Sequence, residues 1–181
     1  MHQIIVIYDR VDREMKNDPP HLANNEREQI AFLAPQIKEH IDGHTVRVLS
    51  STAAHSIGWA QEIAVALSLT DVESHPALWV NADWVSADLK KRPEEAVALV
   101  KERSGDVDTV IVVMNDAGVK TLPYLFYTQL LGMRVAELLM GPWQAYVVNG
   151  QTKQAHHLRN APYSGPGPAI TYRSHGHRCF R

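Results

Sequence analysis

Polar side chains that can bind ligands or carry protons follow three apolar runs of the sequence. Asp9 comes directly after the first run, His55 lies just beyond the second, and Asn115 follows the third. A carboxylate, an imidazole and an amide can exchange protons and hydrogen bonds with a ligand, and a carboxylate can also accept a phosphoryl group. The candidate ligand-binding residues are Asp9, Arg10, Ser51, His55, Asn115, Asp116 and Lys120.

The three runs have the composition of buried strands. They read "QIIVIY" (residues 3–8), "TVRVLSS" (45–51) and "DTVIVVM" (108–114), and all are rich in β-branched residues. Nearly continuous apolar runs of this length are typical of parallel strands covered on both faces. Because parallel strands of such sheets present their carboxyl ends to the ligand crevice, we expect the polar residues that follow them to meet at one edge.

The first helix is predicted between residues 25 and 42, where an apolar stripe recurs every three or four residues. Asn25 with Glu28 resembles a capping box, and Gly43 ends the helix. Pro35 is expected to interrupt and kink it. The stripe consists of Ile30, Leu33, Ala34, Ile37 and Ile41.

Three further helices follow the same pattern. One carries Ile57, Ala60, Ala64 and Leu67, directly after the second strand. Another begins at Pro93 with Glu94 and Glu95, and ends at Lys101, Arg103 and Gly105, in agreement with the helix dipole. A third carries Val119, Leu122, Phe126 and Leu130, flanked by Tyr124 and Tyr127.

The remaining segments are less regular. Residues 71–91 include a possible short strand at 77–80, with Trp79 and Trp84 covering the core, and Trp59 and Trp143 are also assigned to the core. "WQAYVV" and "KQAHHL" flank "NGQT" and predict a hairpin around an Asn-Gly turn. The alternation predicts an α/β three-layer sandwich with a mostly parallel sheet and helices on both faces. We expect one domain over residues 1–159 and a Pro/Gly/His-rich tail over 160–181.

The composition and charge of the chain limit the kinds of partner and cellular location that we expect. The formal net charge of −2 creates no field that would gather nucleic acid or a membrane surface. Cys179 is the sole cysteine, no segment resembles a signal peptide, and no apolar run approaches the roughly 20 residues that span a bilayer. We therefore expect a cytoplasmic protein without a nucleic-acid or membrane partner. In the tail, His175, His177 and Cys179 could chelate zinc or nickel, but tetrahedral ligand spacing is not evident and we predict no metal or other cofactor.

Two stretches beside the predicted rim resemble a known family. "LANNEREQI" (22–30) matches a helix opening of the type "LTERGREQA", and "VLSSTAAHSIGWAQ" (48–61) matches "VLSSPALRARQTAE". In order and spacing these pieces resemble the histidine phosphatase, or phosphoglycerate mutase-like, superfamily, especially its short phosphohistidine phosphatase branch. The resemblance covers roughly residues 3–158 and implies the phosphoglycerate mutase-like fold.

The resemblance fails at the four positions that carry the family's activity. The strand that ends in Arg-His-Gly in the family ends here in Tyr8, Asp9 and Arg10, so an aspartate stands in place of the histidine nucleophile. The second phosphate-binding arginine corresponds to His55, and the second histidine, in "VVGHNPG", corresponds to Asn115 of "VVMNDAG". A further family acidic group has no evident match, with Asp83 as a candidate.

These replacements favour a catalytically degenerate protein. A phosphoryl-transfer site depends on positive charge aimed at the phosphoryl oxygens, and Asp9 would repel such a dianion. We hypothesise a protein without phosphatase activity that binds a small molecule or a protein partner. For single residues, we interpret Asp9 as solvated or paired with Arg10 or His55, His55 as exposed, and "NDAG" as a plain turn.

Two alternatives remain. One is a hydrolase or phosphatase rebuilt around Asp9, with Asp12 or Asp116, that acts with or without a divalent cation such as magnesium. The other is a flavodoxin-like domain for a nucleotide or flavin, although no Gly-rich phosphate loop follows the first strand.

Overall fold

A computed structural model describes residues 3–9, 22–79, 91–114, 122–133 and 144–159 of the chain. Six strands form one sheet in the order β3-β2-β4-β1-β5-β6. β1 to β4 run parallel, whereas β5 and β6 are antiparallel additions at one side. The strands are β1 (Gln3–Tyr8), β2 (Val46–Ser50), β3 (Val72–Ser74), β4 (Thr109–Met114), β5 (Ala145–Asn149) and β6 (Gln154–Leu158).

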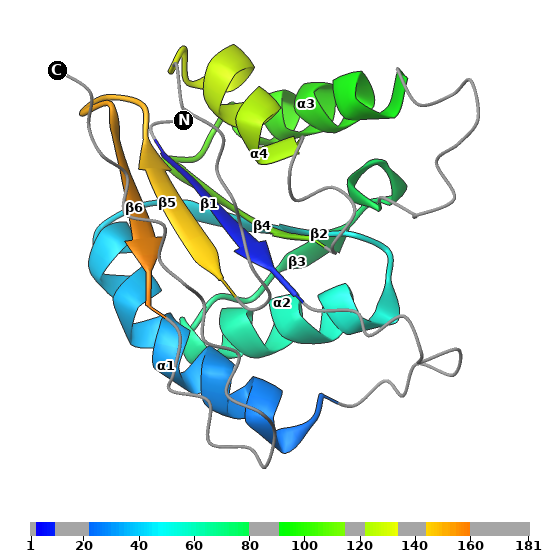
Figure 1. Cartoon of the computed structure of the whole chain (residues 1–181), viewed down its shortest axis with the longest axis vertical. Coiled ribbons are helices and arrows are strands. Elements are labelled where there is room, and N and C mark those ends of the chain that lie inside the picture. The colour runs from blue at the N-terminus through cyan, green and yellow to red at the C-terminus, as the bar shows by residue number, and fades with distance from the viewer. Residues whose placement is uncertain (1–2, 10–21, 80–90, 115–121, 134–143, 160–181) are drawn as a thin grey trace, which may run out of the picture.

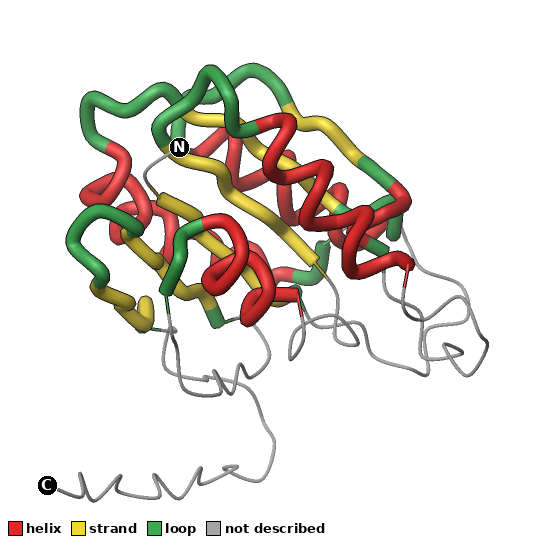
Figure 2. The backbone as a smooth tube through the Cα atoms, turned by 90° about the horizontal axis from the view of Figure 1, so that it is seen from above, coloured by secondary structure: helices red, strands yellow, loops and turns green. Residues whose placement is uncertain are grey.

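Helices cover both faces of the sheet, as Figures 1 and 2 show. Each face has its own apolar core: one packs the sheet against α1 and α2, and the other packs it against α3, α4 and two short turns. This confirms the predicted three-layer α/β sandwich with a mostly parallel sheet. The helices are α1 (Asn24–Ile41), α2 (Ala54–Ala66), α3 (Lys91–Arg103) and α4 (Leu122–Leu125), with a 3₁₀ turn η1 (Pro76–Leu78) and a π turn η4 (Phe126–Leu130).

β1 lies in the middle of the sheet although it comes first in the chain. It pairs in register with β4 on one side, so that Tyr8 lies opposite Met114, and with β5 on the other. Alternate side chains enter opposite cores: Ile5 and Ile7 contact the α1/α2 layer, while Tyr8 packs in the α3/α4 layer. The residue after Tyr8 therefore faces α1 and α2.

The first three predicted helices are confirmed in position, with corrections at their ends. The fourth is described only as the short α4 and the π turn η4, and Val119 lies outside the described residues. All five stripe residues of α1 are buried. The helix begins after Ala23, two residues earlier than the Asn25–Glu28 capping box predicts, because the Glu26 carboxylate accepts the Ala23 backbone N–H at 2.9 Å. Gly43 follows the last turn with φ +72°, a backbone conformation that glycine adopts without strain.

Pro35 does not interrupt α1, which runs through it from residue 24 to residue 41. The interruption predicted from the sequence is therefore wrong. The proline removes the backbone donor that would bond the carbonyl of Ala31. Both residues lie on the exposed side of the helix, where water can satisfy that carbonyl.

The segment after α2 also differs from the prediction. The short strand lies at Val72–Ser74, and residues 77–78, which were expected in a strand, belong to η1. Pro76 favours this turn because it sits at the first helical position and the His75 ring accepts the Ala77 N–H. Trp79 is 43% exposed and does not cover the core. Trp84 and Trp143 lie outside the described residues.

The C-terminal hairpin is confirmed, with a longer turn. β5 and β6 pair antiparallel, and the Asn149 side chain accepts the N–H groups of Gln151 and Thr152. Lys153 takes the left-handed conformation with φ 58°. Beyond β6, the backbone of Arg159 exchanges two hydrogen bonds with the Gln36 side chain of α1, which ties this end of the sheet to the helix.

Replacing Pro35 by alanine should stabilise the fold. An interior proline destabilises a helix by up to about 3 kcal/mol through the lost hydrogen bond and ring crowding. Replacing it by alanine also makes the unfolded chain more flexible, which cancels part of the gain in stability. We expect Pro35→Ala to raise the free energy of unfolding by about 1–2 kcal/mol in urea titrations. Pro93→Ala is the matched control, because Pro93 lies in the first turn of α3, where N–H groups have no helical partner. Equal effects of the two substitutions would contradict this account of Pro35.

Candidate functional site

Asp9 begins the site at the carboxyl end of β1. Its backbone N–H donates to the carbonyl of Met114 at 3.1 Å and continues the pairing of β1 with β4 by one residue. The side chain is completely buried, with 0% exposure. The expectation that Asp9 is solvated is therefore wrong, whereas its expected pairing with His55 is confirmed. Asp9 lies on the same face of β1 as Ile7, so its carboxylate points under α1 and α2 rather than into water.

His55 lies directly above this carboxylate, in the first turn of α2. It is 8% exposed, so the expectation that it is exposed is also wrong. Its Nδ1 lies 3.3 Å from Oδ2 of Asp9, and its Nε2 lies 2.5 Å from Oε1 of Glu26. The imidazole is thus held between two carboxylates that come from different elements.

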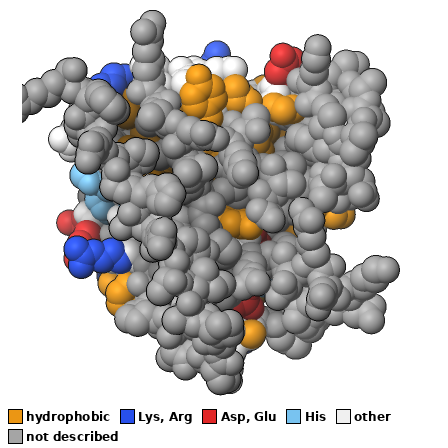
Figure 3. All heavy atoms as spheres, in the orientation of Figure 1, with side chains coloured by type: hydrophobic (Ala, Val, Ile, Leu, Met, Phe, Trp, Pro, Cys, Tyr) orange, Lys and Arg blue, Asp and Glu red, His pale blue; other side chains and the backbone are white. Residues whose placement is uncertain are grey.

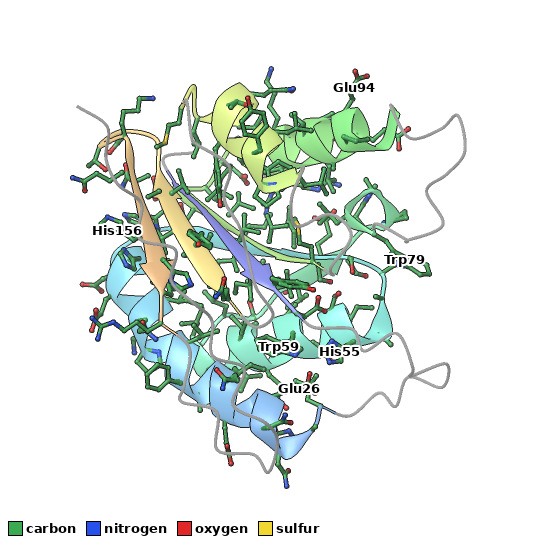
Figure 4. The ribbon with its side chains drawn as sticks, viewed as in Figure 1. Glu26, His55, Trp59, Trp79, Glu94 and His156 are labelled. Atoms are coloured by element: carbon green, nitrogen blue, oxygen red, sulfur yellow. The ribbon has the colours of Figure 1, made fainter. Side chains whose placement is uncertain are left out.

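Glu26 is the third member, contributed by the first turn of α1. Its Oε2 caps the helix through the Ala23 N–H, and its Oε1 also accepts the indole N–H of Trp59 at 3.3 Å. Figure 4 shows Glu26, His55 and Trp59 side by side between α1 and α2. Trp59 is fully buried, as predicted for a core residue. We refer to Asp9, His55 and Glu26 as the buried ion network.

The sequence interpretation missed Glu26, although one signal was present. In the stretch that "LANNEREQI" resembles, the corresponding position is glycine, so Glu26 is an added carboxylate within an otherwise matching segment. In the same resemblance His55 replaces an arginine. Relative to the family segments, Glu26 adds an acid and His55 replaces a strong base by a weaker one. Because the two segments pack together, the added negative charge of Glu26 can pair with the imidazolium of His55.

The charges of the network support one another. Burial lowers the pKa of His55, but hydrogen bonds to Asp9 and Glu26, together with their negative charge, outweigh it and raise the pKa to about 10. Burial raises the pKa of Glu26, but hydrogen bonds from His55 and the Ala23 backbone and the charge of the imidazole reverse this and hold the pKa below its usual value. At neutral pH the network is therefore an imidazolium between carboxylates.

This arrangement restricts the chemistry of His55. Both ring nitrogens donate to carboxylates, so the imidazole has no free lone pair with which to act as a general base or nucleophile. The positive ring also lies at the N-terminus of α2, the positive end of the helix dipole. The first turn of α2 contains no Asp or Glu that would offset this repulsion. Asp9 and Glu26 supply the missing negative charge from outside the helix.

Of the remaining predicted site residues, the structure describes Tyr8 and Ser51. Tyr8 is buried in the opposite core, against the α3 and α4 layer. Ser51 lies at the same sheet edge, where its N–H donates to Val113 and its hydroxyl accepts the Ala53 N–H at 3.4 Å, so it shapes the turn into α2. Residues outside the described part of the chain are Arg10, Asp12, Asp83, Asn115, Asp116, Lys120, His175, His177 and Cys179.

Three buried side-chain oxygens near this edge have no hydrogen-bond partner among the residues that the structure describes. They are Oδ1 of Asp9 and the hydroxyls of Ser50 and Ser56. Ser50 is the last residue of β2 and Ser56 is the neighbour of His55 in α2.

Within the described residues, no group of three or more His, Cys, Asp or Glu side chains is arranged to hold a metal ion. Among the described helices, none has the length and apolar character that a membrane span requires.

Comparison with solved structures identifies the class to which this architecture belongs. The chain has the phosphoglycerate mutase-like fold of the histidine phosphatases. The protein histidine phosphatase SixA, solved with tungstate, aligns with a TM-score of 0.58 at 15% identity over 86% of this chain and 93% of its own. A mycobacterial glucosyl-3-phosphoglycerate phosphatase, solved with VO3, aligns at 0.54 with 13% identity over 90% of this chain and 100% of its own.

A third structure agrees. A phosphoserine phosphatase from Entamoeba histolytica, in complex with phosphoserine, aligns with a TM-score of 0.53 at 13% identity over 88% of this chain and 96% of its own. No family model matches the sequence, and no curated protein matches it. At these identities the likeness establishes the fold, and it confirms the resemblance found in the sequence at the level of architecture.

The pKa of His55 predicts a pH-dependent stability. Because the folded pKa of about 10 lies above the unfolded value of 6.5, the stabilisation is fully present below pH 6.5 and is lost as the pH rises towards 10. We expect the free energy of unfolding to fall across this window by up to about 1.4 kcal/mol per pH unit more than in a His55→Gln variant. Urea titrations followed by circular dichroism at several pH values measure this difference.

His157→Gln is the control for this measurement, since His157 lies on the exposed strand β6. It should retain the pH dependence of the unaltered protein. Parallel curves for the unaltered protein and His55→Gln would show that His55 is not a buried imidazolium.

Proposed function

We propose that this chain is a non-catalytic protein built on the histidine phosphatase fold, and that it acts by binding a small molecule or a protein partner. The observation that carries the proposal is the buried ion network. It occupies the sheet edge at which, by the family resemblance, a phosphoryl group would be bound, and it fills that edge with the protein's own charges.

The nucleophile is the first point in support. The resemblance places Asp9 where the family has its histidine, and the neighbouring imidazole of His55 does not replace it. With a pKa of about 10, His55 is neutral in only about one molecule in a thousand at pH 7. The neutral ring keeps a single N–H, which still donates to one carboxylate, and its other nitrogen faces the second carboxylate rather than a substrate.

Charge is the second point. The network carries one positive and two negative charges, so the described part of this edge is negative overall. A carboxylate about 4 Å from a phosphoryl oxygen repels each unit of its charge by about 4 kcal/mol at an effective dielectric constant of about 20. Tungstate and VO3 are bound by two of the structures that share the fold. We infer that this chain has lost affinity for such oxyanions.

Tungstate calorimetry tests the proposal directly. We expect no saturable binding by the unaltered protein, because Asp9 and Glu26 repel the oxyanion. The matched variant combines Asp9→His, Glu26→Ala, His55→Arg and Asn115→His. It restores three of the four family groups, leaving Tyr8 at the position of the first arginine, and removes the added carboxylate. Its affinity for tungstate should be at least tenfold higher than that of the unaltered protein, provided that its circular dichroism spectrum matches that of the unaltered chain.

A second variant isolates the role of Glu26. Asp9→His with Asn115→His restores both histidines but keeps Glu26 and His55, so it should bind tungstate more weakly than the fourfold variant. Micromolar binding by the unaltered protein would overturn the proposal. So would phosphomonoester hydrolysis that disappears in Asp9→Asn.

One observation favours a second candidate, a phosphatase rebuilt around Asp9. Its Oδ1 is buried and accepts no hydrogen bond from the described residues, so none of them occupies the lone pairs that a nucleophilic carboxylate would use. Incubation with acetyl phosphate and Mg²⁺, followed by intact-mass spectrometry, distinguishes the candidates. Our leading proposal predicts no covalent phosphate. A hydroxylamine-sensitive phosphate that is absent from Asp9→Asn would establish the second candidate instead.

A further inference from the structure

Strand β6 carries two adjacent histidines whose side chains face opposite ways. His156 lies opposite Val147, a member of the core beneath α1 and α2, whereas His157 lies opposite Tyr146. The His157 ring packs on the Tyr146 ring with 4.8 Å between centroids. His156 is therefore on the α1 side of the sheet, and His157 is on the other.

A third histidine meets His156 on the α1 side. His40 lies in the last turn of α1, and its ring centroid is 5.5 Å from that of His156, with the rings tilted by 34°. His156 is exposed and His40 is partly exposed. Figure 3 shows histidine side chains at the surface along this side of the molecule, and Figure 4 labels His156 on β6 beside α1.

The two rings are held in place by the contacts around them. Gln36, one helical turn before His40, exchanges hydrogen bonds of 2.9 and 3.0 Å with the backbone of Arg159, three residues after His156. The carbonyl of His40 also accepts a hydrogen bond from the Gln3 amide. The first contact fixes α1 to the end of β6 and the second fixes it to β1, so the backbones that carry the two histidines are held relative to the same sheet, which lowers the ordering cost of binding a ligand between them.

The ring separation fits joint coordination of one metal ion. With a Zn–N bond of about 2.1 Å, an imidazole centroid lies about 3.2 Å from the metal, and two such rings at a tetrahedral angle are about 5.3 Å apart. The observed 5.5 Å is close to this value.

We propose that His40 and His156 form a site for a divalent transition-metal ion of the zinc type, between α1 and β6. Imidazole nitrogens are good ligands for zinc, copper and nickel ions. Since no group of three metal-binding side chains occurs among the described residues, water or an external donor completes the coordination.

Calorimetric titration of the full chain with Zn²⁺ at pH 7.5 tests the site. His40→Ala and His156→Ala should each weaken binding at least tenfold, because each leaves a single imidazole. His157→Ala is the matched control: it removes the neighbouring histidine of the same strand and should leave the affinity unchanged. Circular dichroism and thermal unfolding of each variant without metal verify that the fold is intact.

The tail histidines are a competing source of zinc binding and need their own variant. His175→Ala, His177→Ala and Cys179→Ser are combined in one full-length chain, which should still bind Zn²⁺ through His40 and His156. Histidine ring signals in proton NMR, assigned by the single variants, identify the ligands. Loss of all zinc binding in the combined variant, or unchanged binding in His156→Ala, would overturn the proposal.

Discussion

The buried ion network is the interaction on which the arrangement of this edge depends. It joins the end of β1, the first turn of α1 and the first turn of α2 through one imidazolium. Removing charges from water costs several kcal/mol per ion, and the network offsets this with short hydrogen bonds, a helix cap and the Trp59 indole. Its members are interdependent, because His55 joins the two carboxylates and deleting it leaves Asp9 buried without its imidazolium partner.

The same interaction links the fold to the proposed loss of catalysis. An oxyanion site keeps its donors unsatisfied until the ligand arrives, and such donors are a standing cost to stability. Here, among the described residues, the imidazolium of His55 is paired with the carboxylates of Asp9 and Glu26 within the protein. The arrangement therefore gains cohesion between two helices and the sheet, and gives up the positive charge that a phosphoryl ligand would need.

The architecture could be predicted from the sequence, because the strands are continuous apolar runs and the helices carry regular stripes. Helix ends and single side chains could not, because long-range partners decide them. Glu26 sets the start of α1 because its carboxylate accepts hydrogen bonds from both the Ala23 backbone and His55. Asp9 is buried because side chains alternate along β1, which points its carboxylate towards the helices that cover the end of the strand. His55 illustrates the limit: near a helix start it suggests exposure, and only the approach of α1 from 29 residues away buries it.

The central place of β1 has a consequence for synthesis on the ribosome. β1 emerges first, yet its parallel neighbour β4 follows more than 100 residues later. At about 5–20 residues per second, "QIIVIY" waits roughly 5–20 s with both edges open, an interval in which such a segment can pair with another chain. Asp9, charged and adjacent to the run, opposes that misassembly. A residue that ends up fully buried thus also protects the nascent chain before its partners exist.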